Sequence, residues 1–402
     1  MLSNWISRLS YVNIIGRNCC QSAISSDTTF PHRLRAIPTR MASGDVSGAQ
    51  KMVKLSPYIG THDGTFHCDD VTACYMLKTL DRFKDHDIVR TRDPEKLAKA
   101  EIVVDVGGEL DVDRLRLDHH QRTFNQTIKD YHPNLRVTNP QKPSRLSSSG
   151  LVYAIFGKDC ITKQLNLGRT YEDLKDKDDA RKMVDQIFEK AYLEFFEEID
   201  AIDNGVDIAS GEQVVYNYHI NSGISSRVGR HNPHDMNATP EVRLANFKKA
   251  MEMVGAEIEE GIKFLGEIWW PKRQEFRQYV LKRHEFDQSG QIVHIDSDHL
   301  VSWKSALYEL EEELGIVGEI KFIVFTDVNA TTRWRATAVP VELKSFQSRV
   351  PFKEEWRGKR DEELQKASGV SDATFVHMSG FTGGALSLDG IKSLVRQTLG
   401  LQ

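Results

Sequence analysis

The most informative segment of this 402-residue chain reads Ile59-Gly60-Thr61-His62-Asp63-Gly64-Thr65-Phe66-His67-Cys68-Asp69-Asp70. Residues 57–60 predict the end of a short strand. Apolar residues then recur at intervals of three, at Val71, Cys74, Leu77 and Leu80. This spacing predicts a helix that begins near Cys68. The His and Asp side chains therefore lie on a strand-to-helix turn, where ligands bind in an open parallel α/β sheet.

A solvated acidic loop is the alternative interpretation of this segment, because clustered charges are usually surface. A second apolar run, residues 102–108, argues for a functional site, because it contains a single acid, Asp105. A continuous β-branched run is typical of a strand buried on both faces. A carboxylate there is costly unless it is paired or bound to a metal. The alternative for Asp105 is an acid exposed at the end of the strand.

A third polar cluster, Asp118-His119-His120, follows another short apolar segment. Neighbouring histidines at a strand end point in different directions, so one can bind a metal while the other faces a substrate. Further along, a helix that begins within residues 178–185 is expected to stop at Asn204-Gly205. Asp200 and Asp203 share a face of that helix. Asp203, at its end, is the better candidate for a fourth ligand.

The polar strand ends together hold His62, His67, Asp69, Asp70, Asp105, Asp118, His119, His120 and Asp203. So many carboxylates in one crevice would repel one another without cations between them. Mixed carboxylate and imidazole ligands suit manganese, magnesium, iron or zinc, and fit poorly with calcium. The set exceeds what one ion needs. It predicts two divalent metals bridged by a carboxylate, an arrangement that supplies a hydroxide nucleophile and holds a phosphoryl group.

The composition of the chain argues against several classes of protein. The net charge of −5 gives no global positive field, so a nucleic-acid partner would need a local basic patch. The five cysteines form no CxxC pair, which argues against a disulfide scaffold or structural zinc and favours a reducing compartment. No apolar run approaches the ~18 residues of a membrane span. The oligomeric state stays open.

Residues 1–50 differ from the rest of the chain. Their first forty positions carry Arg8, Arg17, Arg33, Arg35 and Arg40 but one acid, Asp27. An Arg-rich, Ser-rich and acid-poor segment predicts a mitochondrial transit peptide and a location in the matrix. The alternative is a disordered extension without a targeting role. Met41 is a possible second start, which would allow a form without the presequence.

Beyond the catalytic segment (51–238) we expect a connecting helix (239–286) and a smaller α/β domain (287–402). Pro271 is expected to kink or interrupt the helix. The last domain has expected strands at 292–295, 320–325, 332–339 and 374–377, with Arg333 and Arg335 on one strand face. Within the first domain, the basic segment 221–231 contains Arg227 and Arg230. It is either a phosphate cradle or a flexible surface loop.

The Asp118-His119-His120 cluster, the strand-end Asp105, the early His/Asp cluster and Asp203 resemble the DHH phosphoesterase superfamily. Its members include RecJ-type exonucleases, nanoRNases and manganese-dependent pyrophosphatases. More narrowly, five ordered blocks resemble the melanocyte-proliferating-gene exonuclease family from about residue 56 to the C-terminus. The blocks are residues 60–69, 103–108, 118–121, 200–205 and 346–349.

The resemblance implies a fold and an activity. It implies a two-domain α/β protein with a parallel-sheet catalytic domain, and a metal-dependent 3′–5′ exonuclease acting on single-stranded RNA in mitochondria and nucleus. Two Mn²⁺ or Mg²⁺ ions are the expected cofactors. The implied metal ligands are His62, His67, Asp69, Asp105, His119 and Asp203, with Asp105 as the bridge. His120 would contact the scissile phosphate, with Asp118 and Asp70 as the other catalytic residues.

The substrate-binding residues are expected to be Arg227, Arg230, Arg333, Arg335, Gly383 and Gly384. Gly383-Gly384 resembles the glycine-rich substrate loop of the superfamily but lacks the His that follows it there. His67 also stands where the superfamily usually has an acid. Two alternatives to the RNA exonuclease stay open. One is a small-molecule phosphoesterase that hydrolyses pyrophosphate or oligonucleotides, and the other is a non-catalytic metal-dependent binder.

Overall fold

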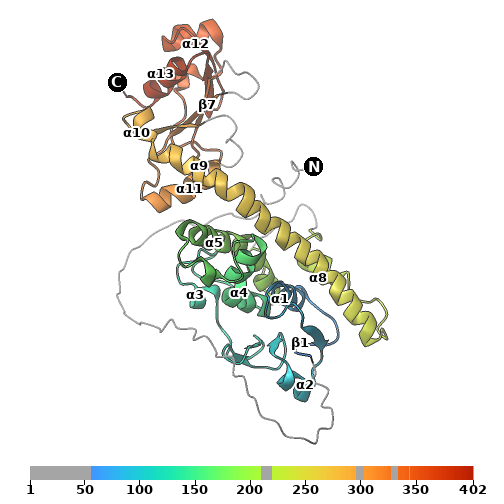
Figure 1. The fold of residues 1–402 in the computed structure, drawn as a ribbon. Coiled ribbons are helices and arrows are strands. Elements are labelled where there is room, and N and C mark those ends of the chain that lie inside the picture. The colour runs from blue at the N-terminus through green and yellow to red at the C-terminus, as the bar shows by residue number, and fades with distance from the viewer. Residues whose placement is uncertain (1–55, 210–219, 296–302, 327–333, 344, 402) are drawn as a thin grey trace, which may run out of the picture. The chain divides into compact units, whose positions relative to one another are not determined.

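The fold is taken from a computed structural model, which describes residues 56–209, 220–295, 303–326, 334–343 and 345–401 (Figure 1). Two predictions fall outside these ranges. One is the transit peptide expected in residues 1–50, and the other is the placement of Arg333. The expected domain boundaries stay predictions.

The first sheet has five strands in the order β2-β1-β3-β5-β4. They are β1 (Tyr58–Thr61), β2 (Asp87–Arg90), β3 (Ile102–Val104), β4 (Leu110–Asp111) and β5 (Arg116–Leu117). β1 pairs in parallel with β2 and β3, and β3 pairs in parallel with β5. β4 is antiparallel to β5, because the short connection between them forms a hairpin rather than a crossover. The sheet is therefore mixed, and the expected all-parallel sheet is wrong at this edge.

Local capping signals explain where several helices begin. The helices of this part are α1 (Cys68–Thr79), α2 (Pro94–Lys99), α3 (Ile128–Tyr131), α4 (Ser148–Gln164), η2 (Tyr171–Leu174), α5 (Asp178–Ala191), η3 (Tyr192–Phe196) and α6 (Glu197–Asp203). Asp93 caps α2 by accepting a hydrogen bond from the amide of Glu95 at 2.9 Å. α4 begins at Ser148, because the side chain of Ser147 caps it by accepting a hydrogen bond from the amide of Gly150.

The basic segment 221–231 differs from its expected loop structure, since it contains the short helix α7 (Ile224–Gly229). The long helix α8 (Pro240–Lys263) follows (Figure 1). Helical structure continues through the π-helical segment η4 (Phe264–Trp269) into α9 (Trp270–Leu281). The expected interruption at Pro271 does not occur. A π-helical turn lies directly before the proline, a usual way for a helix to accommodate a disturbed hydrogen-bond ladder.

A second five-stranded sheet has the order β6-β7-β8-β10-β9. Its strands are β6 (Ile292–Ile295), β7 (Phe322–Thr326), β8 (Trp334–Ala338), β9 (Ala373–Val376) and β10 (Thr382–Ala385). Only the β6–β7 pair is parallel. The accompanying helices are α10 (Arg283–Phe286), α11 (Trp303–Leu314), η6 (Glu354–Trp356), α12 (Asp361–Ser368) and α13 (Leu388–Thr398). Gly383 and Gly384 thus lie in strand β10, and the expected glycine-rich loop is wrong.

The core that supports the first sheet is built mainly on α1, α4 and α8, whose buried residues include Leu77, Leu151 and Val254. α1 and α8 approach closely at Gly255, where an added Cβ would lie 2.2 Å from the ring of Tyr75. The second sheet has its own buried clusters. Among the described residues, no helix combines the length and the apolar character needed to cross a membrane.

Candidate metal centre

The candidate centre lies where three adjacent parallel strands end. His62 follows β1, Asp105 follows β3, and Asp118 and His119 follow β5. These strands are neighbours in the order β1-β3-β5, so their carboxyl ends lie at the same edge of the sheet. The sheet topology therefore brings together three clusters that are separate in the sequence.

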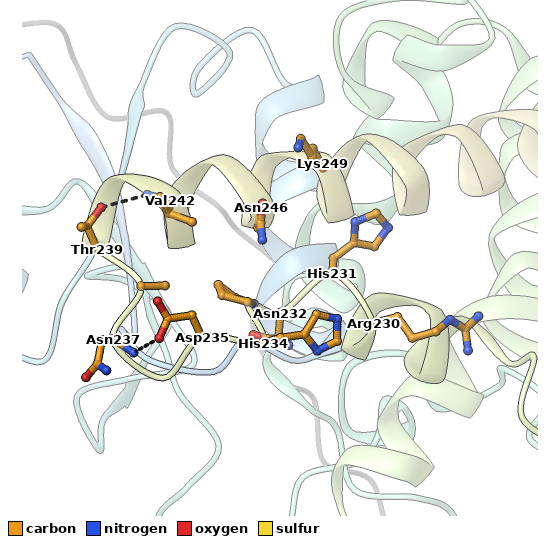
Figure 2. Close-up of a pocket in the computed structure, with 12 residues that line it drawn as sticks. Arg230, His231, Asn232, His234, Asp235, Asn237, Thr239, Val242, Asn246 and Lys249 are labelled. Carbon is orange, nitrogen blue, oxygen red and sulfur yellow. Dashed lines mark hydrogen bonds between the residues drawn. The ribbon is translucent and has the colours of Figure 1, made fainter.

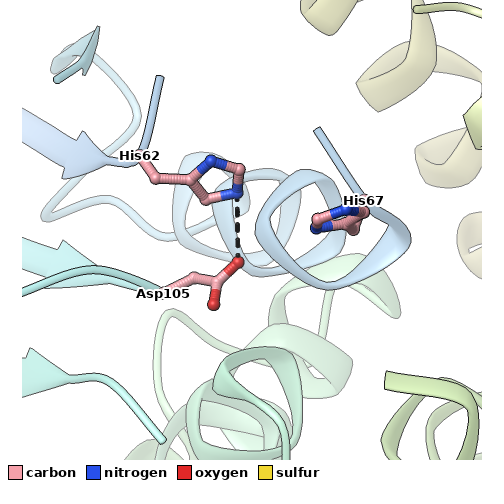
Figure 3. A group of neighbouring side chains, drawn as sticks. All are labelled: His62, His67 and Asp105. Carbon is pink, nitrogen blue, oxygen red and sulfur yellow. Dashed lines mark ion pairs between the residues drawn. The ribbon is translucent and has the colours of Figure 1, made fainter. Parts of the chain in front are cut away.

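Asp105 lies between two histidines. Its Oδ2 is 3.3 Å from Nε2 of His62 (Figure 3). Its Oδ1 is 3.5 Å from Nε2 of His119. The backbone of Asp105 has a φ of 57°, in the left-handed region that is costly for most non-glycine residues. The left-handed backbone at Asp105, at the end of β3, thus accompanies a side chain whose two carboxylate oxygens each face a different imidazole.

A second carboxylate group surrounds His119 on its other side. Nε2 of His119 is 3.1 Å from Oδ2 of Asp203 and 3.7 Å from Oδ2 of Asp69. Asp69 accepts hydrogen bonds from the backbone amides of Ser148 and Ser149, at the first turn of α4. A helix N-terminus stabilises negative charge, so α4 helps to hold this carboxylate in place.

Within the described parts of the chain, three sets of side chains have ligand atoms close enough to share a metal ion. They are His62, His67 and Asp105; Asp105, His119 and His120; and Asp69, His119 and Asp203. Asp105 and His119 each belong to two of the sets. The six residues expected as ligands, which are His62, His67, Asp69, Asp105, His119 and Asp203, all belong to at least one set.

The carboxylates of the site strongly raise the pKa values of His62 and His119. Burial disfavours the imidazolium of His62, but the carboxylates of Asp105 and Asp70 outweigh it and raise its pKa to about 10. Asp105 and Asp203 likewise raise the pKa of His119 to about 10 against the effect of burial. In turn, these two histidines hold the pKa of Asp105 well below its usual range despite its burial. Asp105 and the two histidines therefore stabilise one another's charged forms.

The unpartnered atoms of the site fit a divalent cation. Among the described residues, Oδ1 of Asp105, Oδ2 of Asp70 and Nε2 of His119 are buried and lie at ion-pair distances from their neighbours, but none of them forms a hydrogen bond. Buried polar atoms in proteins are normally paired, so these exceptions need an explanation. The donor set of imidazole nitrogens and carboxylate oxygens suits manganese, magnesium, iron or zinc. The residues present therefore fit a divalent metal.

The three residues expected to be catalytic take different positions. Asp118 is buried, accepts a hydrogen bond from the amide of Gly108, and lies 2.7 Å from Nδ1 of His120. The side chain of His120 is 62% exposed, so it can meet a substrate. Asp70 is buried beside His62, with Oδ2 3.2 Å from Nε2, and its Oδ1 accepts a hydrogen bond from the amide of His67. Asp70 is in none of the three ligand sets.

Arg90 is a buried residue of the site that sequence reasoning missed. Its side chain is 6% exposed, and its guanidinium carbon lies 5.3 Å from the ring centre of Phe66 and 4.9 Å from that of Phe247. It donates a hydrogen bond to the carbonyl of Gly64 and lies 3.9 Å from Asp70. Arg90 ends β2 opposite Thr61, so the strand-end rule that identified Asp105 could have found it.

The residues expected to bind substrate lie on several different elements. Arg227 is paired with Glu257 of α8, and Arg230 donates a hydrogen bond to the carbonyl of Asn221. Arg335 lies on β8 opposite Gly384 of β10, while Arg333 lies outside the described residues. Among the described residues, Arg227 and Arg230 are thus engaged by neighbours in the first domain, and Arg335 belongs to the second sheet.

A small cavity of about 180 Å³ adjoins Arg335 in the second sheet. The guanidinium carbons of Arg335 and Arg360 lie 5.6 and 5.7 Å from the ring centre of Phe375. Gly384 also lines the cavity, and a Cβ there would lie 2.7 Å from that ring. Sequence reasoning missed Arg360, because only a β-bridge to Phe375 brings it to this strand.

Comparison with known proteins gives consistent matches over most of the chain. The model of an uncharacterised protein family, UPF0160 (MYG1_exonuc), matches residues 58–399. The MYG1 exonuclease of Bos taurus is 42% identical over 345 residues, covering 85% of this chain and 84% of the relative.

Two other relatives match over similar lengths. The MYG1 exonuclease of Homo sapiens is 42% identical over 346 residues, covering 85% of this chain and 86% of the relative. The MYG1 protein C27H6.8 of Caenorhabditis elegans is 40% identical over 347 residues, covering 86% of this chain and 96% of the relative. The chain therefore belongs to the MYG1 exonuclease family.

Proposed function

We propose that this protein is a metal-dependent 3′–5′ exonuclease that hydrolyses single-stranded RNA with two divalent ions, Mn²⁺ or Mg²⁺. The position of Asp105 carries the proposal, because its two oxygens face His62 and His119 in neighbouring ligand sets. Mammalian relatives bear the name exonuclease. The resemblance of the Asp118-His119-His120 cluster to DHH phosphoesterases supports a phosphodiester substrate.

In this proposal His62, His67 and Asp105 would hold one ion, Asp69, His119 and Asp203 would hold the other, and Asp105 would be shared. When bound, such a pair lowers the pKa of a bound water and stabilises the charge of the phosphoryl group. His120 is exposed at the rim of the site and donates a hydrogen bond to a phosphate oxygen. Asp118 orients its ring from the buried side.

The cavity in the second sheet supports a polynucleotide substrate. Arg335 and Arg360 offer cationic, planar groups, and Phe375 offers an aromatic ring between them. Arginine and aromatic side chains are the groups that hold single strands without reading sequence. A pyrophosphatase would need little beyond the metal centre. This cavity therefore favours the exonuclease over the small-molecule phosphoesterase.

The deciding experiment is hydrolysis of 5′-labelled single-stranded RNA by the full chain in Mn²⁺, Mg²⁺ or EDTA. We expect a ladder that shortens one nucleotide at a time, with metal only. Pyrophosphate and a dinucleotide are assayed beside it, and His119→Ala is the inactive control. Cleavage of the small substrates alone would replace the exonuclease with a small-molecule phosphoesterase. Metal binding without any hydrolysis would favour the non-catalytic binder.

The role of the second-sheet cavity is tested separately. Arg335→Ala and Arg360→Ala are expected to raise KM for a 20-nucleotide RNA by about tenfold and to leave dinucleotide hydrolysis unchanged. Lys366→Ala is the matched control, because Lys366 is an exposed residue of α12. Equal losses on both substrates would argue against a polynucleotide-binding role.

We also propose that the protein acts in the mitochondrial matrix, with a smaller nuclear pool, because residues 1–40 are rich in Arg and Ser and contain one acid. Fluorescent fusions of the full chain and of a form that starts at Met41 test this. The full chain is expected in mitochondria and the shorter form outside them. Identical distributions would contradict the proposed transit peptide.

A further inference from the structure

A separate cavity of about 510 Å³ lies between residues 230–239 and the first turns of α8 (Figure 2). Its wall includes Arg230, His231 and His234 on one side, and Asn246 and Lys249 of α8 on the other. The volume lies within the ~300–1,000 Å³ range of small-molecule sites. The cavity is therefore large enough for one nucleotide unit.

The cavity lining is rich in cationic and nitrogen donor groups. Arg230 and Lys249 carry positive charge, and His231 and His234 offer imidazole nitrogens, against one acid, Asp235. The Asp235 carboxylate accepts a hydrogen bond from the amide of Asn237 at 2.8 Å. Within the described parts of the chain, the side chains of Lys249, His231 and His234 have no ion-pair or hydrogen-bond partner. The lining thus suits an anionic ligand.

The cavity is structurally connected to the metal centre. Asn232, one of its lining residues, accepts a hydrogen bond from the amide of Phe66 at 3.0 Å and donates one to its carbonyl at 2.9 Å. Phe66 directly precedes His67, a member of a ligand set. The ring of Phe66 also meets Phe247 of α8 edge to face at 5.5 Å. The segment that carries His67 therefore contacts Asn232 of the cavity lining and Phe247 of α8, the helix that forms the other wall.

We propose that this cavity binds a backbone phosphate of the substrate chain next to the phosphodiester that is hydrolysed. The proposal rests on the proposed function, since it assigns a place to a second phosphate of the same RNA. Lys249 is the principal contact, as a point charge on the α8 wall. Phosphate contacts of this kind position a nucleic acid without reading its sequence.

The test measures binding without hydrolysis. The full chain in EDTA is titrated with a fluorescein-labelled ten-nucleotide RNA at several salt concentrations. Lys249→Ala is expected to raise Kd about three- to tenfold and to reduce the slope of log K against log salt by ~0.7, as for one lost phosphate contact on a single strand. Lys249→Glu is expected to weaken binding further. Equal thermal melting of all variants confirms that they fold.

Lys248→Ala is the matched control, because Lys248 is the neighbouring exposed residue of α8 and does not line the cavity. The Kd of Lys248→Ala is expected to stay within twofold of that of the unmodified chain. Its salt slope is expected to equal that of the unmodified chain within experimental error. Equal weakening by both alanine variants, or no weakening by Lys249→Ala, would overturn the assignment. The assay measures binding and does not depend on catalysis. Weaker binding by Lys249→Ala, with Lys248→Ala unchanged, therefore supports the cavity as a phosphate site even if RNA hydrolysis is absent.

Discussion

Oδ1 of Asp118 lies 2.7 Å from Nδ1 of His120. Asp118 is buried and its other oxygen accepts a hydrogen bond from Gly108, whereas the side chain of His120 is 62% exposed. The pKa of His120 is raised, chiefly by this contact with Asp118. A buried carboxylate thus orients an imidazole at the open side of the site and favours its protonated form, which is the arrangement expected of a group that contacts a phosphate.

Asp118→Asn tests this arrangement. Loss of the carboxylate removes the main cause of the raised pKa, so His120 loses its proton at a lower pH. We expect kcat to fall about 100-fold, and the alkaline limb of the pH–rate profile to move to lower pH. Metal content should stay unchanged, because Asp118 is in none of the ligand sets. Asp113→Asn, an exposed acid nearby, is the control; an unmoved alkaline limb would refute the positioning role.

Asp105→Asn tests the shared carboxylate. Asparagine tolerates a left-handed backbone, so the φ of 57° should be kept and the fold preserved. The variant removes the charge that faces both His62 and His119. We expect metal affinity to fall more than ~100-fold, beyond the usual effect of losing an outer partner. Calorimetric titration with Mn²⁺ measures it. Retention of two ions with unchanged affinity would exclude Asp105 as a bridge.

Arg90→Gln tests the buried guanidinium. The substitution removes the contacts with the Phe66 and Phe247 rings and the cationic group that lies 3.9 Å from Asp70. We expect a loss of about 2 kcal/mol in the free energy of unfolding, together with weaker metal binding. Arg90→Lys should restore the charge but only part of the stability, since lysine lacks the planar group.

Arg92→Gln is the control for this series. Arg92 belongs to the same segment, but its pair with Asp63 is exposed, and exposed pairs contribute little. If Arg92→Gln weakened metal binding as much as Arg90→Gln, the effect would come from general charge rather than from the position of Arg90.

Asp200 predicts a pH dependence of stability. Burial raises the pKa of its carboxyl to about 7, despite hydrogen bonds from the Ser147 amide and with the Tyr192 hydroxyl. Between pH ~4 and ~7 the folded protein keeps a proton that the unfolded chain has released. The folded state therefore loses stability as pH rises through this window.

Asp200→Asn should remove that loss, which is on the order of 4 kcal/mol across the window. Urea unfolding in EDTA at pH 4, 5.5 and 7 measures the difference between the two proteins. The unmodified chain is expected to lose stability relative to the variant as pH rises. Parallel stability curves would contradict the assignment of the pH effect to Asp200.

Local signals in the sequence were sufficient for several elements. β1, the turn with His62 and helix α1 follow from an apolar run, a polar turn and a period of three within about twenty residues. Asp93-Pro94 starts α2, and Asn204 ends α6. The antiparallel edge strand β4 and strand β10 were not predicted, because their pairing depends on distant partners rather than on their own residues.

The sequence by itself determined which residue types the site contains and that they follow strand or helix ends. Only the tertiary structure decided their roles. Asp69 and Asp70 are neighbours, yet Asp69 accepts hydrogen bonds from the start of α4 and joins His119, while Asp70 lies against His62. Successive residues of a helix point about 100° apart, so neighbouring carboxylates meet different surroundings. What each one meets depends on α4, β3 and β5, and only folding brings these elements to the same edge.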